Sequence, residues 1–272
     1  MQMSDKIKKF TVEQAIDYMN KNPVKNLPKL LDWADAFCKG EFENQRRAIR
    51  KACLDPTDAH YPMVQHMLND IDPEVLKTTL VNFFIYGNMI GWDQEDALRE
   101  KYGCNIPWAI LMDPTSACNL HCTGCWAAEY GNKLNLSLEE LDDIICQGKD
   151  MGVYFYIYTG GEPLVRKKDL ITLCERHPDC EFLSFTNGTL IDEAFADEML
   201  RVKNFVPAIS LEGDETTTDS RRGAGTYQKV MHAIELLHER KLIYGISSCY
   251  TSVNWDAISS EDYFRKLIDL GC

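Results

Sequence analysis

The chain has 272 residues, 45% of them apolar and 26% charged, and its 42 acidic and 29 basic residues give a net charge of −13. This composition is typical of a globular protein with one or two domains, and the acidic charge excludes the basic surface that nucleic acid binding requires. The longest apolar stretch, residues 80–92, is interrupted by polar residues and glycines, so we expect no transmembrane segment. The 11 cysteines, together with an N-terminus that lacks a secretory signal, favour the cytoplasm, with free thiols or metal ligands rather than disulfides.

Residues 1–105 predict an all-helical N-terminal region. Apolar residues recur at a spacing of three to four in Phe10–Met19, Leu27–Phe37, Glu41–Cys53, His60–Leu68, Pro73–Ile90 and Gln94–Tyr102. Asp72 before Pro73 predicts an N-cap followed by proline in the first helical position. This region contains no metal-binding or nucleotide-binding motif.

From Ile106 onward, short β-branched and aromatic runs alternate with helical segments, which predicts an α/β fold with a parallel sheet. The predicted strands are Trp108–Met112, Val153–Tyr158, Phe182–Phe185, Phe205–Ser210 and Tyr244–Cys249. The predicted helices are Leu138–Met151, Lys167–Arg176, Glu193–Arg201, Thr226–Arg240 and Ser260–Leu270, the first with a capping box formed by Ser137 and Glu140. Residues 106–272 therefore predict five βα units of a partial parallel (β/α) barrel.

Polar or glycine-rich residues follow each predicted strand. Three cysteines follow the first strand; the others are followed by Thr159–Pro163, Thr186–Gly188, Ser210–Gly213 and Ser247–Tyr250. Because the carboxyl ends of parallel strands open on one face of a barrel, we expect these residues to converge on one site.

Cys118, Cys122 and Cys125 form a C-x3-C-x2-C motif. Three thiolates on one loop can hold three corners of an iron–sulfur cluster and leave one metal corner open. Two alternatives are an iron–sulfur protein that only transfers electrons and a zinc-binding interaction module. The first would not need polar residues after the later strands, and the second would need a fourth ligand, for which His121 is the nearby candidate.

The cysteine motif, followed by Tyr158-Thr-Gly160-Gly161-Glu162-Pro163, resembles the radical S-adenosylmethionine (SAM) superfamily. The resemblance implies a 4Fe–4S cluster on Cys118, Cys122 and Cys125 that binds SAM at its open iron and cleaves it reductively. The 5′-deoxyadenosyl radical then abstracts hydrogen from a substrate. It further implies a low-potential electron donor, such as a flavodoxin or ferredoxin. The substrate would be a peptide, small molecule or lipid, which leaves peptide or cofactor maturation and lipid modification open.

The resemblance also implies roles for residues after the later strands. The turn formed by Gly160, Gly161, Glu162 and Pro163 would receive the ammonium of SAM, with Glu162 balancing its charge. Ser210 and Glu212 would contact the ribose hydroxyls or the methionyl group. Arg222 would bind the SAM carboxylate, since a guanidinium group suits a carboxylate. Asn187 would donate a further hydrogen bond.

Three features depart from the family pattern or extend it. Gly124 stands where many members carry an aromatic residue against the adenine, and Trp126 is the alternative aromatic group. The family core usually has six βα units, so we expect this chain to lack the sixth strand and the C-terminal extension. Cys249, at the end of the fifth strand, is a candidate catalytic residue for substrate contact or hydrogen donation. The remaining cysteines lack the close spacing of an auxiliary cluster.

Overall fold

A computed structural model of the chain describes residues 14–18, 21–37 and 43–272. Contacts divide the chain into two compact units, Met1–Val81 and Asn82–Cys272. The sequence placed this boundary at residues 105–106, whereas the helical segment after Val81 belongs to the second unit. The reason is aromatic packing: the Phe83 ring lies 5.7 Å from the Trp108 ring and 5.9 Å from the Phe155 ring, both edge-on.

The first unit is helical, as predicted. Its helices are α2 (Pro23–Phe37), α3 (Glu43–Leu54), α4 (Tyr61–Asp70) and α5 (Pro73–Leu80). The first predicted helix, Phe10–Met19, lies largely outside the described residues, although residues 14–18 are helical. The predicted N-cap is confirmed, since the Asp72 carboxylate accepts hydrogen bonds from the backbone N–H groups of Glu74 and Val75.

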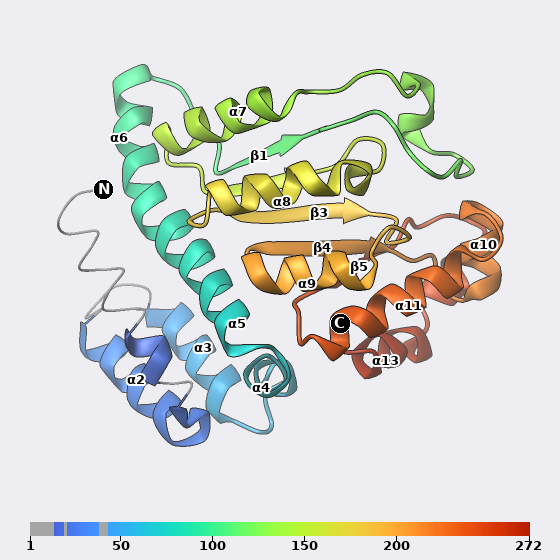
Figure 1. Cartoon of the computed structure of the whole chain (residues 1–272). Helices are drawn as coiled ribbons and strands as arrows, with labels where there is room; N and C mark the ends of the chain where they lie inside the picture. Colours follow the sequence, from blue (N-terminus) through green and yellow to red (C-terminus); the bar gives the residue numbers. More distant parts are fainter. Residues whose placement is uncertain (1–13, 19–20, 38–42) are drawn as a thin grey trace. The chain divides into compact units, whose positions relative to one another are not determined.

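The second unit begins within a π-helical segment and continues as an α/β structure (Figure 1). Before the sheet come η1 (Val81–Gly91) and α6 (Trp92–Tyr102). The strands are β1 (Ala109–Met112), β2 (Phe155–Tyr158), β3 (Glu181–Thr186), β4 (Phe205–Ser210) and β5 (Gly245–Ser247). The helical elements between and after them are η2 (Trp126–Tyr130), α7 (Leu138–Asp150), η3 (Pro163–Arg166), α8 (Lys167–Arg176), α9 (Glu193–Val202), α10 (Glu215–Arg222), α11 (Thr226–Glu239), α12 (Trp255–Ile258) and α13 (Glu261–Asp269).

The five strands form one parallel sheet in the order β1-β2-β3-β4-β5. The predicted strands, the five predicted helices of this unit and the Ser137–Glu140 capping box are therefore confirmed. Sequential order with helical crossovers is the arrangement of a (β/α) barrel wall.

One face of the sheet is buried against the helices α7, α8 and α9, which lie side by side in Figure 1. Tyr156, Tyr158 and Phe182 on this face have no exposed surface. The Tyr156 hydroxyl donates to the carbonyl of Ile145 in α7 at 2.9 Å, which ties the helix layer to the sheet.

The opposite face of the sheet is only partly buried. Its side chains form a row across the strands, because Leu111 pairs in register with Ile157, Ile157 with Leu183, and Leu183 with Val206. Leu111 is 59% exposed and Phe185, two residues beyond Leu183, is 40% exposed. We call this surface the open face, and its carboxyl end is where the polar residues gather.

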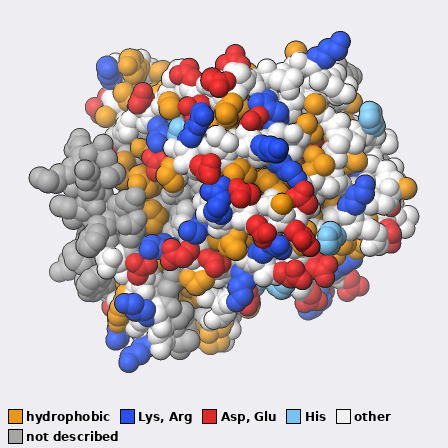
Figure 2. Space-filling view, in the orientation of Figure 1, with side chains coloured by type: hydrophobic (Ala, Val, Ile, Leu, Met, Phe, Trp, Pro, Cys, Tyr) orange, Lys and Arg blue, Asp and Glu red, His pale blue; other side chains and the backbone are white. Residues whose placement is uncertain are grey.

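The surface of the molecule is mixed in charge: acidic and basic side chains are interspersed on the side seen in Figure 2. Ion pairs such as Lys167–Asp192 and Arg201–Glu198 accord with this pattern. Within the described ranges, the helices are too short or too polar to cross a bilayer.

Candidate functional site

The three cysteines lie on the cysteine loop (residues 113–125), which connects β1 to η2. Their side chains are partly buried, and all three lie within one stretch of eight residues, Cys118 to Cys125. Burial raises the pKa of Cys118 and of Cys122, and at Cys122 the positive charge of Arg222 opposes the effect. The Leu120 N–H points to the Cys118 sulfur at 3.5 Å, so the loop presents its first sulfur to a backbone donor.

The double-glycine turn after β2 packs directly against the cysteine loop. Gly161 N–H donates to the Thr115 carbonyl at 2.9 Å, and Glu162 N–H donates to the Ala117 carbonyl at 2.8 Å. A Cβ atom on Gly161 would lie 2.3 Å from the Ala117 oxygen, and Gly160 has a φ of +101°. The absence of a side chain at Gly161 therefore lets the backbone of the cysteine loop approach the turn closely.

The Glu162 carboxylate is buried between the ends of β2 and β3. It accepts hydrogen bonds from the Thr186 hydroxyl at 2.6 Å, from Asn187 N–H at 2.7 Å and from Leu164 N–H at 3.0 Å. Burial nevertheless raises the pKa of Glu162, against these hydrogen bonds. Glu162 therefore joins two strand ends, with Pro163 buried beside it at the start of η3.

Asn187 connects the end of β3 to the cysteine loop. Its side-chain N–H donates to Asn119 Oδ1 at 2.8 Å, and its own Oδ1 accepts from the N–H and hydroxyl groups of Thr189. The Asn119 side chain in turn donates to the Thr189 hydroxyl at 2.8 Å. Sequence reasoning identified Asn187 but not Asn119, which gave no signal beyond its place inside the motif.

Glu212, at the end of β4, is the central acceptor of the site. Its fully buried carboxylate accepts from Arg221 Nη1 and Arg222 Nε, each at 2.9 Å, from Arg222 Nη2, and from Cys249 N–H at 2.9 Å. Arg222 Nη1 lies 3.9 Å from the Cys122 sulfur. Glu212 thus faces two arginines and the end of β5 rather than an open space.

Arg221, which sequence reasoning missed, bonds to the cysteine loop through both its backbone and its side chain. Its carbonyl accepts from Thr123 N–H at 2.8 Å, and its Nε donates to the Thr123 carbonyl at 3.3 Å. Both arginines end α10, a helix that was not predicted and that begins at the capping box of Asp214 and Thr217.

Two further predicted residues lie at the same end of the sheet. Ser210 is partly exposed and pairs in register with Ser247, and the Cys249 side chain is exposed. The structure thus brings all the predicted site residues to one end of the sheet, around the cysteine loop. Trp126 follows the loop, is 60% exposed and packs edge-on against Tyr130.

A cavity of about 690 Å³ lies at the edge of β1, beside this constellation. Its lining includes Leu111, Tyr130, Gly160 and Gly161, whereas neither the three cysteines nor Arg222 line it. The cavity therefore adjoins the double-glycine turn and the start of the cysteine loop, although the three sulfurs do not line it.

Comparison with known proteins agrees with this geometry. The family model of the radical SAM superfamily matches residues 112–264, which is more than half of the chain. A Fe-coproporphyrin III synthase of Methanosarcina barkeri is 31% identical over 50% of this chain and 35% of its own length. A probable GTP 3′,8-cyclase of Archaeoglobus fulgidus is 31% identical over 51% of this chain and 47% of its own.

The structure of SuiB from Streptococcus suis, bound to S-adenosylmethionine, shares the fold with a TM-score of 0.55 at 19% identity. The likeness covers 88% of this chain and 49% of that one. Among the curated relatives, the chain spans about a third to about half of their length. Fold, cysteine loop and family match together show that the chain belongs to the radical SAM superfamily.

Proposed function

We propose that this chain is a radical SAM enzyme whose 4Fe–4S cluster is held by Cys118, Cys122 and Cys125. The observation that carries the proposal is the bracing of the cysteine loop. The glycine turn contacts the loop after β2, Asn187 contacts it after β3, and Arg221 and Arg222 contact it from the last turn of α10. A loop that only transferred electrons would not need the ends of three other elements gathered around it.

The donor set fits the cluster. Three soft sulfur ligands on one loop match iron–sulfur chemistry and leave a fourth corner for a substrate. Held by these three cysteines, such a cluster would supply the electron that reductive cleavage of SAM requires. The electron would come from a flavodoxin-like or ferredoxin-like donor.

Arg222 is the proposed partner of the SAM carboxylate. Two of its nitrogens are engaged by Glu212, while Nη1 is directed to the side of Cys122, where a bound carboxylate would sit next to the cluster. We assign Glu212 as the positioning residue that fixes this guanidinium. A guanidinium held in one orientation binds a carboxylate at lower entropic cost.

The remaining predicted residues take supporting or binding roles. Carbonyl groups of the turn at Gly160 and Gly161 are the proposed acceptors for the SAM ammonium. Glu162 also holds that turn to the end of β3, through Thr186 and Asn187. Ser210, at the carboxyl end of the open face, is the proposed contact for the ribose hydroxyls.

The substrate is proposed to lie over the open face of the sheet. Leu111, Ile157, Leu183 and Phe185 give this face an apolar floor, and the exposed Cys249 thiol lies near its polar end. An organic molecule with an apolar portion, such as a cofactor precursor or a peptide side chain, fits that floor.

The test is reductive SAM cleavage by the anaerobically reconstituted protein. With dithionite as reductant, the wild type should form 5′-deoxyadenosine, and Cys122→Ala should form none. Cys104→Ala, an exposed thiol outside the site, is the matched control and should retain activity. A full iron complement without 5′-deoxyadenosine would favour electron transfer, and bound zinc without iron would favour an interaction module.

A further inference from the structure

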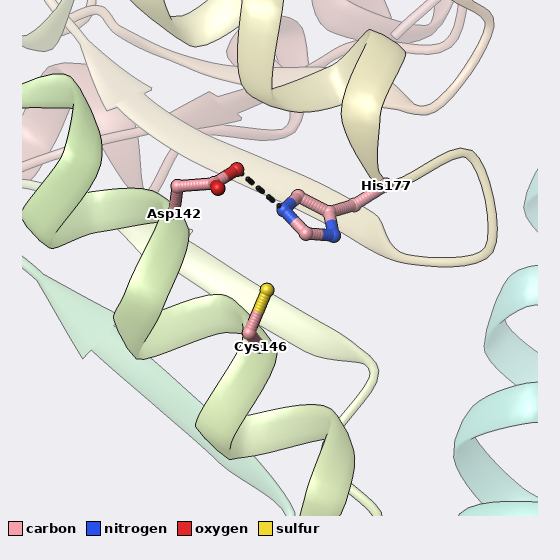
Figure 3. A group of neighbouring side chains, drawn as sticks. All are labelled: Asp142, Cys146 and His177. Atoms are coloured by element: carbon pink, nitrogen blue, oxygen red, sulfur yellow. Dashed lines mark hydrogen bonds and ion pairs between the residues drawn. The ribbon is translucent and has the colours of Figure 1, made fainter.

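A second group of potential metal ligands lies on the helical side of the sheet (Figure 3). Asp142 and Cys146 are one turn apart on α7, and His177 follows the last residue of α8. One ligand atom from each of the three residues lies within 4.8 Å of the others, and His177 Nε2 is 3.0 Å from an Asp142 oxygen. Among the described residues this is the one such group of three.

This group is separate from the cysteine loop. His177 precedes β3, whereas the loop packs at the carboxyl end of the same strand, through Asn187. The six residues of β3 span about 20 Å at the usual rise per residue. A metal at Asp142, Cys146 and His177 would therefore occupy the opposite end of the sheet from the proposed cluster.

The three donors match zinc in chemistry. A thiolate, an imidazole and a carboxylate are its ordinary ligands, and three protein ligands leave one position for water. Zinc with a thiolate and a carboxylate is electrically neutral, so the partly buried position carries little charge penalty. Cys146 is exposed, which gives the ion an entry path and the water a place.

Burial holds the imidazole of His177 beside the other two ligands. The His177 side chain is only 6% exposed, and Nδ1 is buried without a hydrogen-bond partner in the described part of the chain. Metal binding at Nε2 moves the ring proton to Nδ1 and releases the thiol proton of Cys146.

Arg176 also contacts Asp142, with Nη1 3.4 Å from the same oxygen that meets His177. The Arg176 side chain is 44% exposed and can turn to solvent, and the second carboxylate oxygen remains available.

We propose that Asp142, Cys146 and His177 bind a zinc ion that joins α7 to the connection between α8 and β3. The ion would link α7 to the end of α8 at the amino end of the strands, with its fourth position left for water. This proposal does not depend on the proposed function, because it uses none of the residues assigned to SAM or the cluster.

In the test, Zn²⁺ is added to the full chain after its iron–sulfur cluster has been assembled, and the protein is then dialysed anaerobically. Elemental analysis should show one retained zinc per chain, and zinc X-ray absorption should show a shell with one sulfur and lighter N/O neighbours. Cys146→Ala and Asp142→Ala should lose this zinc without losing iron. Cys104→Ala, another exposed thiol, should keep both metals.

Three results would overturn the proposal. They are wild-type protein that retains no zinc, zinc retained equally by Cys146→Ala, and a shell with three sulfurs, which would place the ion on the cysteine loop. Iron content and 5′-deoxyadenosine formation are measured on the same samples, so a failure of the cluster assignment is recorded separately from a failure of the zinc site.

Discussion

Glu212→Gln is the most informative single substitution at the site. It preserves the shape of the side chain but removes its charge and replaces one acceptor oxygen with an N–H donor. That donor must face either the guanidinium groups of Arg221 and Arg222 or the N–H of Cys249, which are themselves donors. The substitution therefore leaves two arginines without a counter-charge, and it places the new amide N–H against another hydrogen-bond donor.

The expected loss in the free energy of unfolding follows from the burial of Glu212. Removing one partner of a buried ion pair costs about 3–5 kcal/mol. Glu212 has no exposed surface, while the Arg221 and Arg222 side chains keep 18% and 11% exposed and so recover some hydration. We expect the lower end, about 3 kcal/mol, or roughly two powers of ten in the unfolding equilibrium constant.

Urea denaturation followed by far-UV circular dichroism measures this loss, and iron retention after reconstitution gives a second result. Iron should fall as well, because Arg221 holds the cysteine loop through Thr123. The matched control is Glu215→Gln, an exposed residue of the same helix that accepts a hydrogen bond from Gln228, with an expected change in unfolding free energy within about 0.5 kcal/mol. A loss below about 1 kcal/mol for Glu212→Gln, with normal iron, would refute the reasoning.

Three more outcomes follow from individual contacts. Gly161→Ala places a Cβ 2.3 Å from the Ala117 oxygen and should destabilise the chain by about 2 kcal/mol or more in urea; an unchanged midpoint would count against this packing. Alanine substitution of Asn119 and Asn187, singly and together, should give a coupling free energy of about 1 kcal/mol in urea unfolding. Additive losses of unfolding free energy would show that the two side chains are not bonded. Hydrogen bonds in its capping box lower the pKa of Asp214 below the unfolded value, so its stabilisation is present above that value and fades as pH falls through the folded pKa. The thermal stability advantage of the wild type over Asp214→Asn should therefore shrink in acid below about pH 4, and a constant difference would contradict the assignment.

The fold was predictable because its signals are local. Short β-branched and aromatic runs that alternate with helical segments predicted the five strands and the helices between them. Ser137 and Glu140 predicted the start of α7, where the structure has it. The division into two units was not predictable from periodicity. It depends on Phe83 reaching Trp108 and Phe155, a contact between segments far apart in the chain.

At the site, residue types were predictable but their partners were not. Glu162 was recognised from its motif, yet its three donors include Thr186, which lies 24 residues away. Helix α10 escaped notice because its sequence, ETTTDSRR, has no apolar periodicity. It is held instead by the Asp214 cap and by the pairing of its two last arginines with Glu212.

The central claim is that three cysteines leave one iron open to SAM. The most direct measurement is the electron paramagnetic resonance spectrum of the reduced, reconstituted protein, recorded with and without SAM. The account predicts that SAM changes the g-values of a 4Fe–4S signal, because its amino and carboxylate groups would enter the coordination of that iron. A 4Fe–4S signal that is identical in the two spectra would contradict it.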